Sequence, residues 1–368
     1  MKKILLLFIF ILILPFQGCG SDFKGGVDED IDYSIYDNNI NENSLRVGVA
    51  MPTKDLQRWR QDAQYIENGL KEAGFKVDCQ VADNDVDKQI EQITGMIESE
   101  CDALVIAAID GGALTDVLTK AKEKQIPVIA YDRLIMNTDA VSYYVSFDNA
   151  LVGTLQGEYI EKSLDLKNAK GPFHIELFAG SPDDNNSIFY YNGAMDILQP
   201  YIDSGKLIVT SKEIERETCS IKNWSTETAQ KRMEQLLDKY YKDGTTLDAV
   251  LSPNDSIANG ITAAITQRSL SSFPILTGQD CDINSVKNII NDTQSMSVYK
   301  DTRISAQKTV EMVSAILSGK EVEINDTSSY NNGIMNIPAY LCEPIFADKN
   351  NYEELLIDSG YYTKEQLQ

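Results

Sequence analysis

The sequence predicts an α/β protein with two doubly wound parallel-sheet lobes joined by a multi-strand hinge. Short apolar strands alternate with amphipathic helices along most of the chain, and this alternation favours parallel sheets with right-handed crossovers. The alternation forms two successive sets, divided near residue 149. The chain of 368 residues is also longer than the roughly 250 to 300 residues that one hydrophobic core usually serves. Two domains are therefore expected.

The first set begins with a strand at residues 45–51, where apolar residues alternate and Pro52 follows. Residues 57–73 have apolar residues at helical spacing, and Gly74 is placed to end this helix. The continuous apolar run at residues 103–109 is typical of a strand that is buried on both faces. The remaining predicted elements are strands at 76–82, 127–131 and 141–145 and helices at 85–99 and 114–124.

The second set repeats this order after a predicted helix at residues 149–164. A later amphipathic helix, at 304–317, follows the completed second sheet and can return to the first lobe, so the chain would cross between the lobes several times. We therefore expect an N-terminal lobe of residues 45–148 and 301–328 and a C-terminal lobe of residues 149–300 and 329–368. The remaining predicted elements are strands at 173–178, 207–210, 249–251, 274–277 and 296–300 and helices at 187–198, 225–240, 257–267 and 352–357.

The N-terminal segment predicts export. Lys2 and Lys3 precede an apolar run at residues 4–14, which is too short to span a bilayer and suits the core of a secretory signal. Residues 1–18 are therefore expected to be a cleaved signal peptide. Cys19 follows Gly18 as in a bacterial lipoprotein start, which predicts a lipid anchor on Cys19; ordinary secretion with an incidental cysteine is the alternative.

Residues 19–44 are predicted to form a flexible tether between this anchor and the folded body. The segment is rich in Asp, Asn, Ser and Gly and has few large apolar residues, so it cannot bury enough surface to offset the entropy of ordering. We expect a protein outside the cytoplasm, in the periplasm or on the outer face of the membrane, that contacts the membrane only through its lipid.

Composition argues against several classes of function. The formal net charge of -23 disfavours nucleic acid as a partner, because phosphate binding relies on Lys and Arg. The cysteines beyond Cys19 are widely spaced and odd in number and form no Cys-x-x-Cys, so free thiols are favoured and one disulfide stays possible. The acidic stretch at residues 83–87 lacks the glycine and the glutamate of a calcium loop and suits helix capping. We expect no metal and no cofactor.

Catalytic residue patterns are absent from the sequence. His174 is the one histidine and lies in an apolar predicted strand, where a core residue is more common than a general base. The chain has no Gly-x-Ser-x-Gly nucleophile elbow, no Walker A motif and no Gly-x-Gly-x-x-Gly after its first strand. The sequence predicts a binding protein that is not an enzyme.

Polar and aromatic residues collect where the predicted strands end. Open parallel sheets bind ligands outside the carboxyl ends of their strands, so these side chains are expected at one cleft. Carboxylates, amides and cations can satisfy both the donor and the acceptor roles of sugar hydroxyls. Two tryptophans, Trp59 and Trp224, are expected to sandwich a sugar ring from opposite lobes. The residues that follow predicted strands are Lys54, Arg58, Trp59, Asp110, Asp132, Arg133, Asp184, Asn185, Asn186, Asn254, Asp255, Gln279, Asp280 and Lys300.

Five stretches of the chain match a known family: residues 50–54, 128–133, 180–186, 278–280 and 299–303. With them, from Leu45 to Gln368, the chain resembles the bacterial multiple-monosaccharide-binding proteins, which are relatives of the xylose- and ribose-binding proteins and deliver sugars to ABC importers. The resemblance implies a type 1 periplasmic binding protein fold that closes over a pyranose.

The resemblance also implies roles for individual residues. Lys300 would contact the ligand from the hinge, and at residues 254–255 either Asn254 or Asp255 would touch it. The implied first-lobe contacts are Arg58, Trp59, Asp132 and Arg133, and the implied second-lobe contacts are Asp184, Asn186, Trp224, Asn254 and Asp280.

The expected function is capture of an aldose such as glucose, galactose, arabinose or xylose by a monomeric lipoprotein. Its expected partners are the permease and ATPase subunits of an ABC importer. The alternative is a sugar-sensing receptor whose closed form is read by a chemoreceptor or a sensor kinase. A catalytic lobe acting on glycosidic bonds would need flanking paired carboxylates, and a repressor would need a basic helix-turn-helix before residue 45.

Overall fold

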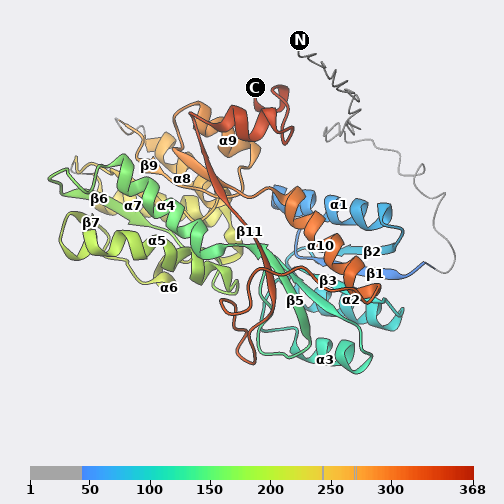
Figure 1. Ribbon diagram of the computed structural model, residues 1–368. Coiled ribbons are helices and arrows are strands. Elements are labelled where there is room, and N and C mark those ends of the chain that lie inside the picture. The colour runs from blue at the N-terminus through green and yellow to red at the C-terminus, as the bar shows by residue number, and fades with distance from the viewer. Residues whose placement is uncertain (1–43, 243, 269, 271) are drawn as a thin grey trace, which may run out of the picture.

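The computed structural model describes residues 44–242, 244–268, 270 and 272–368. The predicted signal peptide, Cys19 and all of the predicted tether except Ser44 lie outside these residues. Two bodies lie side by side and several segments connect them (Figure 1). None of the described helices combines the length and the apolar character that crossing a bilayer requires.

The first lobe is built on a six-stranded sheet in which every neighbouring pair is parallel, with the order β11-β5-β4-β3-β1-β2. Its strands are β1 (Arg46–Met51), β2 (Lys76–Val81), β3 (Ala103–Ile106), β4 (Val128–Tyr131), β5 (Val141–Phe147) and β11 (Ala339–Cys342). Its helices are α1 (Gln57–Glu72), α2 (Val86–Glu98), α3 (Thr115–Glu123) and α10 (Thr302–Leu317).

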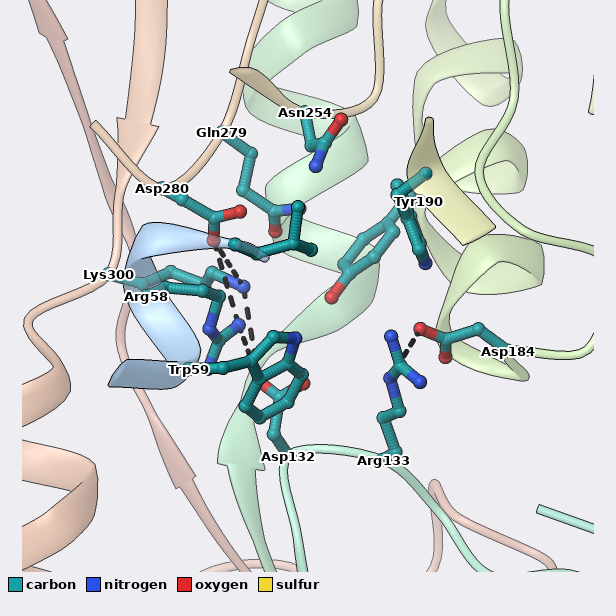
Figure 2. A pocket seen from close by; sticks show the side chains of 12 residues that line it. Arg58, Trp59, Asp132, Arg133, Asp184, Tyr190, Asn254, Gln279, Asp280 and Lys300 are labelled. Carbon is teal, nitrogen blue, oxygen red and sulfur yellow. Dashed lines mark ion pairs between the residues drawn. The ribbon is translucent and has the colours of Figure 1, made fainter. Parts of the chain in front are cut away.

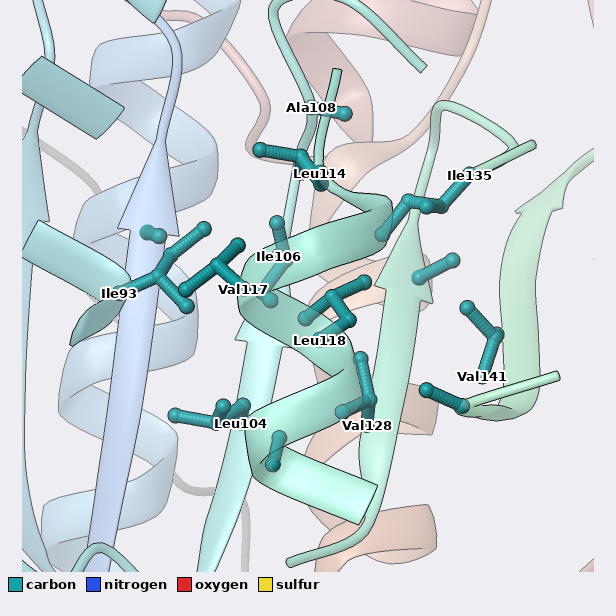
Figure 3. Close-up of a cluster of buried hydrophobic side chains, with 14 of the residues drawn as sticks. Ile93, Leu104, Ile106, Ala108, Leu114, Val117, Leu118, Val128, Ile135 and Val141 are labelled. Atoms are coloured by element: carbon teal, nitrogen blue, oxygen red, sulfur yellow. The ribbon is translucent and has the colours of Figure 1, made fainter. Parts of the chain in front are cut away.

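Alternate residues of these strands pack on opposite faces of the sheet, because successive side chains of a strand point to opposite sides. Leu104 and Ile106 of β3 pack with Leu118 of α3, as Figure 3 shows. Val105 of the same strand packs with Val313 of α10 on the other face. The first sheet is therefore buried on both faces, as its continuous apolar runs predicted.

The second lobe is built on a four-stranded parallel sheet with the order β7-β6-β8-β9. Its strands are β6 (Phe173–Leu177), β7 (Leu207–Val209), β8 (Ala249–Leu251) and β9 (Ile275–Leu276), and beside them lies the antiparallel pair β10 (Met296–Tyr299) and β12 (Ile345–Asp348). Its helices are α4 (Asn149–Ser163), α5 (Asn186–Asp203), α6 (Arg216–Cys219), the 3-10 turn η2 (Lys222–Trp224), α7 (Thr226–Tyr240), α8 (Asp255–Arg268), α9 (Ile283–Ile290), the π-turn η3 (Glu353–Asp358) and the 3-10 turn η4 (Glu365–Leu367).

The chain crosses between the lobes at three places. It leaves the first sheet between β5 and α4, returns between β10 and α10, and leaves again between β11 and β12. The sequence assigned residues 329–368 to the second lobe, and this assignment is wrong for β11, which pairs with β5 in parallel. A four-residue strand behind an irregular stretch carries too little local pattern to reveal its partner.

Two further predicted features differ from the structure. The predicted strand at 103–109 ends at Ile106, because the buried Gln89 side chain bonds the backbone of the following segment: its Nε2 donates to the Ala107 carbonyl and its Oε1 accepts from Ile109 N–H, both at 2.9 Å. His174 is half-buried, and its Nδ1 lies 3.0 Å from Thr210 Oγ1.

The cysteines and the acidic stretch agree with their predictions. The five described cysteines are free thiols; Cys79 is half-buried and the other four are buried. In the acidic stretch, Asp85 caps α2 by accepting from Lys88 N–H at 3.1 Å, and Asp83 pairs with the Lys88 ammonium at 2.6 Å. Helix capping therefore accounts for this stretch.

Candidate functional site

A cavity lies between the lobes, at the carboxyl ends of the strands of both sheets (Figure 2). Such an edge is where open α/β sheets bind ligands. The first lobe contributes Leu56, Arg58, Trp59, Asp132 and Arg133; the second lobe contributes Asp184, Tyr190, Trp224, Asn254, Gln279 and Asp280; Lys300 enters from the hinge.

Arg58 is the centre of an ion-pair network inside the first lobe. Its Nη2 lies 2.8 Å from Asp62 Oδ2, one helical turn along α1, and its Nη1 lies 2.9 Å from Asp132 Oδ2. Tyr131 donates to the other Asp62 oxygen at 2.8 Å. Arg58 is 6% exposed and Asp62 is fully buried, so the guanidinium is held in one orientation before any ligand arrives.

The backbone of Asp132 turns sharply after β4. Its φ of 59° lies in the left-handed region, which is uncommon for a residue other than glycine, and its carbonyl oxygen accepts hydrogen bonds from Tyr144, Ser146 and Asn186. These three donors offset the strain of the turn. The Asp132 carboxylate is thereby directed at Arg58 and Lys300.

Arg133 connects the two lobes. Its Nη1 donates to the carbonyls of Ala108 and Ile109 in the first lobe, at 3.0 and 3.3 Å. Its Nε lies 2.9 Å from Asp184 Oδ2 in the second lobe, an ion pair whose angle falls short of a hydrogen bond, and Figure 2 shows this contact across the cavity. Asp184 precedes α5 and also accepts from Asn186 N–H at 3.0 Å.

Lys300 and Asp280 form the hinge side of the cavity. The Lys300 ammonium is 1% exposed and lies 3.0 Å from Asp280 Oδ1 and 3.9 Å from Asp132 Oδ2. Asp280 also lies 3.6 Å from Arg58 Nη1. Two cations and two carboxylates from both lobes therefore meet in one water-poor cluster, where charge-assisted hydrogen bonds are strong.

Burial and neighbouring charges shift the acids of this cluster in different directions. Burial alone would raise the pKa of Asp132, but Arg58, Lys300 and Arg133 outweigh it and lower the pKa. For Asp62 burial outweighs the attraction of Arg58, so its pKa is raised. The pKa of Asp184 is also raised, because burial outweighs the attraction of Arg133. Asp132 is therefore held as a carboxylate, a fixed acceptor toward the cavity.

The aromatic residues line the cavity from both lobes. Trp59 is 2% exposed, and the guanidinium groups of Arg58 and Arg133 lie 4.4 and 5.2 Å from its ring centroid. Trp224 packs edge-on against Tyr190 at 6.2 Å between centroids. A Cβ on Gly180 would come 2.1 Å from the Trp224 ring, so glycine is required there for the indole to lie flat on the backbone.

Several buried polar atoms of the cavity have no hydrogen-bond partner among the described residues. Those that make no ion pair either are the indole N–H groups of Trp59 and Trp224 and the Gln279 Oε1. Such atoms are costly to bury unless another group bonds them. Two donors, one acceptor, several ion-paired groups and two indole rings suit a small ring with many hydroxyl groups.

Five of the residues expected after predicted strands are absent from the cavity lining: Lys54, Asp110, Asn185, Asn186 and Asp255. Lys54 is exposed, and its carbonyl oxygen accepts from Arg60. Asp110 caps the next turn by accepting from Gly112 N–H at 2.8 Å. Asn186 is fully buried behind the cavity, where its Nδ2 donates to the Asp132 carbonyl at 2.6 Å. Local capping and support of a neighbour explain these positions.

The positions of the two side chains show which of Asn254 and Asp255 faces the cavity. Asn254 lines the cavity, and its Oδ1 accepts from Ile257 N–H at 3.0 Å as the cap of α8. Asp255 points into the second lobe, where Ser297 and Gln294 donate to its carboxylate. Burial, reinforced by Asp282 and Asp280, raises the pKa of Asp255 well above its ordinary value. Asp255 is thus a structural acid.

Sequence reasoning missed two lining residues as site residues, Tyr190 and Leu56. Tyr190 lies inside α5, where its apolar neighbours hide it, and Leu56 carries no polar signal. Gln279, which the sequence placed after a predicted strand beside Asp280, does line the cavity. The roles of all the predicted residues in ligand binding stay predictions.

Comparison with known proteins agrees with this geometry. The periplasmic binding protein domain matches residues 47–321. The multiple sugar-binding periplasmic receptor ChvE of Rhizobium radiobacter is 48% identical over 325 residues, which are 87% of this chain and 92% of the relative. The D-xylose-binding periplasmic protein of Escherichia coli is 33% identical over 323 residues, 88% of this chain and 92% of the relative.

Solved structures match over the same range. A crystal structure of an ABC transporter solute binding protein from Clostridium phytofermentans with bound β-D-glucose has a TM-score of 0.87 and 58% identity, and covers 88% of this chain and all of that chain. One from Chloroflexus aurantiacus in complex with D-glucose has a TM-score of 0.79 and 32% identity, covering 88% and 98%. The chain therefore belongs to the periplasmic binding protein family with the type 1 fold, in the group that contains the multiple sugar-binding and D-xylose-binding proteins.

Proposed function

We propose that this protein captures an aldose monosaccharide between its lobes, outside the cytoplasm, and delivers it to an ABC importer. The observation that carries the proposal is the cavity in which Trp59 and Trp224 lie with buried, ion-paired Arg58, Asp132 and Arg133. An indole ring packs against the C–H face of a pyranose, and the charged groups bond its hydroxyls.

The relatives support glucose- or xylose-type sugars as ligands. The Clostridium protein, at 58% identity, is described with β-D-glucose, and the relatives at 33 to 48% identity are named for multiple sugars or D-xylose. The ligand groups that these aldoses share are ring hydroxyls, which the unpartnered Trp59 Nε1, Trp224 Nε1 and Gln279 Oε1 can bond.

Intrinsic fluorescence is a direct test, because the sequence contains only two tryptophans and both line the cavity. Titration with D-glucose, D-galactose, D-xylose and L-arabinose should change the emission, and calorimetry should give micromolar or tighter affinity, roughly -8 kcal/mol or more favourable. Folded protein that binds no aldose of the panel contradicts the sugar proposal. Binding without any change in emission places the sugar away from the indoles.

Closure is the second part of the proposal. A ligand that bonds both lobes favours the closed state selectively, so small-angle scattering should give a smaller radius of gyration with saturating sugar. An identical curve with and without sugar contradicts hinge closure. Product analysis after incubation with oligosaccharides separates binding from glycoside hydrolysis.

We further propose that Cys19 carries lipid and that residues 1–18 are removed. Cys19→Ala should release the protein from the membrane fraction and leave sugar affinity unchanged, because the segment at residues 19–44 separates anchor from fold. Membrane retention of the variant contradicts the anchor.

Sensing is the second candidate, favoured by the description of the 48% identical relative as a receptor. A chemoreceptor or sensor kinase would read the same closed form. Deleting the importer permease separates the two roles: sugar uptake should stop, and a sugar-dependent signal should remain only if the protein also serves a sensor.

A further inference from the structure

The chain's last segment reaches back across the lobe boundary to α1. Tyr361 and Tyr362 follow η3 and pack with Cys281, Val286 and Tyr299 in a buried cluster of the second lobe. Their hydroxyl groups lie at the face of α1 that carries Gln57 and Gln61, one turn apart. Figure 1 shows the C-terminal segment beside the second lobe, above the hinge.

Gln57 bonds the second lobe with both atoms of its side-chain amide. Its Nε2 donates to the Tyr362 hydroxyl at 2.6 Å, and its Oε1 accepts from Ile283 N–H at 3.2 Å. Tyr362 in turn donates to the Cys281 carbonyl at 2.9 Å. Tyr362 is 3% exposed, whereas Gln57 is half-buried, so the junction is partly shielded from water.

Tyr361 adds weaker contacts to the same junction. Its hydroxyl lies 3.5 Å from Gln61 Oε1 and 3.4 Å from Thr302 Oγ1 at the start of α10. The Arg303 guanidinium lies 5.1 Å from the Tyr361 ring centroid, and its Nη1 donates to the Ser359 carbonyl at 3.1 Å. The C-terminal segment therefore contacts one of the chain crossings as well as α1.

None of these groups lines the sugar cavity, yet Gln57 directly precedes Arg58 in the first turn of α1. A contact between the lobes that is lost on opening stabilises the closed state alone, and such a contact raises ligand affinity. Gln57, Tyr361 and Tyr362 make contacts between the lobes, and none of them lines the cavity.

We propose that Gln57 and the Tyr361–Tyr362 pair form a latch that holds the lobes closed and sets the rate of sugar release. The latch rests on the proposed sugar-binding function, and it adds positioning residues that lie outside the cavity. Its bonds have to break before the lobes separate, so they slow dissociation of the sugar.

Tyr362→Phe is the sharpest test, because it removes one hydroxyl and keeps the ring in its buried cluster. Using the aldose of the panel that the parent binds most tightly, we expect Kd to rise about 3- to 10-fold, the effect of a typical hydrogen bond. Stopped-flow tryptophan fluorescence should assign the loss mainly to faster dissociation. Gln57→Ala should give a similar loss, and the double variant should lose less than both single changes together.

Tyr159→Phe is the matched control. Tyr159 donates to the Ser295 carbonyl at 3.0 Å, and both residues lie in the second lobe, so this variant should keep the parent's Kd and dissociation rate. Urea unfolding of each sugar-free variant separates lost fold from lost closure.

The outcomes distinguish the two proposals. A parent protein that binds none of the aldoses contradicts the proposed function. A parent that binds, with folded Tyr362→Phe and Gln57→Ala variants that both release sugar at the parent's rate, contradicts the latch. A Tyr159→Phe variant that weakens binding as strongly as Tyr362→Phe also contradicts it, because the effect would then not depend on contacts between the lobes.

Discussion

The two sides of the cavity are held in different ways. On the first-lobe side, Arg58 is paired with Asp62 and Asp132 of its own lobe at 2.8 and 2.9 Å and lies farther, at 3.6 Å, from Asp280 of the second lobe. Arg133 donates to two carbonyls of its own lobe. On the second-lobe side, Asp184 takes its cationic partner, Arg133, from across the cavity. Asn186 likewise bonds Asp132 and Tyr144 of the first lobe.

This difference suggests how the site can keep an ordered binding surface and still release its ligand. A side whose charges are paired internally keeps its geometry when the lobes separate, so it presents a formed surface to the ligand. A side whose partners lie in the other lobe is completed on closing, so its bonds contribute selectively to the closed state. Replacements on the two sides should therefore change different measured quantities.

The largest expected effect is on stability, from Arg58→Met. The change leaves Asp62 and Asp132 buried without their guanidinium, so the free energy of unfolding of the sugar-free protein should fall by about 3 to 5 kcal/mol. Urea unfolding measures this. Arg133→Met is the matched variant and should cost clearly less, because Arg133 has one carboxylate partner, in the other lobe. Equal losses from both variants would remove the proposed difference between the two sides.

Asp184→Asn should act on binding instead. It removes the charge that pairs with Arg133 across the cavity, so sugar binding should weaken by about 1.5 to 3 kcal/mol, the range for hydrogen bonds to charged groups. The free energy of unfolding without sugar should change by less than about 1 kcal/mol. Calorimetry and urea unfolding test the two statements separately, and a variant that loses stability but keeps its affinity would contradict the comparison.

Asp282, in the second lobe, should make the free energy of unfolding depend on pH. Burial, reinforced by Asp280, raises the pKa of Asp282 from its ordinary value of 3.8 to about 7. Between these two pH values the folded protein holds a proton that the unfolded chain has lost. Its contribution to the free energy of unfolding is therefore complete below about pH 4 and is lost as the pH rises toward 7.

Asp282→Asn should flatten this part of the stability profile. We expect the difference in free energy of unfolding between parent and variant to change by about 1 to 2 kcal/mol from pH 4.5 to 7.5. This is less than the full pKa shift implies, because the Asp282 side chain is partly exposed and solvent screens its charge. Urea unfolding across this range measures it. Parallel profiles for parent and variant would show that Asp282 does not titrate there.

The smallest expected effect separates two roles of Asn254. Its Oδ1 caps α8 while its amide group faces the cavity. Asn254→Ser keeps a capping oxygen and should weaken sugar binding by about 1 kcal/mol with little loss of stability. Asn254→Ala should show the same binding loss and an additional loss of about 1 kcal/mol in the free energy of unfolding. Unchanged affinity in both variants would remove Asn254 from the proposed contacts.

Local pattern was sufficient for most of the fold because each lobe repeats strand and helix units that bury their own apolar faces. It was sufficient also for site residues that follow strands directly, such as Asp132 and Arg133, since parallel strands bring their carboxyl ends to one edge. It failed for Lys54 and Asp110, which also follow strands: Lys54 is exposed to solvent, and Asp110 caps a turn. The type of residue at a strand end does not tell which way its side chain points.

The sequence by itself determined the α/β class, the two-sheet organisation and the edge at which the cavity forms, because these depend on hydrophobic periodicity and on the order of elements along the chain. Only the tertiary structure decided which polar residues meet there. It placed Tyr190 in the cavity and turned Asp255 away from it, and it added β11 to the first sheet. It also brought Tyr362 beside Gln57, from the opposite end of the described chain. Contacts of this kind join residues far apart in sequence, and they depend on how two lobes approach one another, for which local patterns carry no signal.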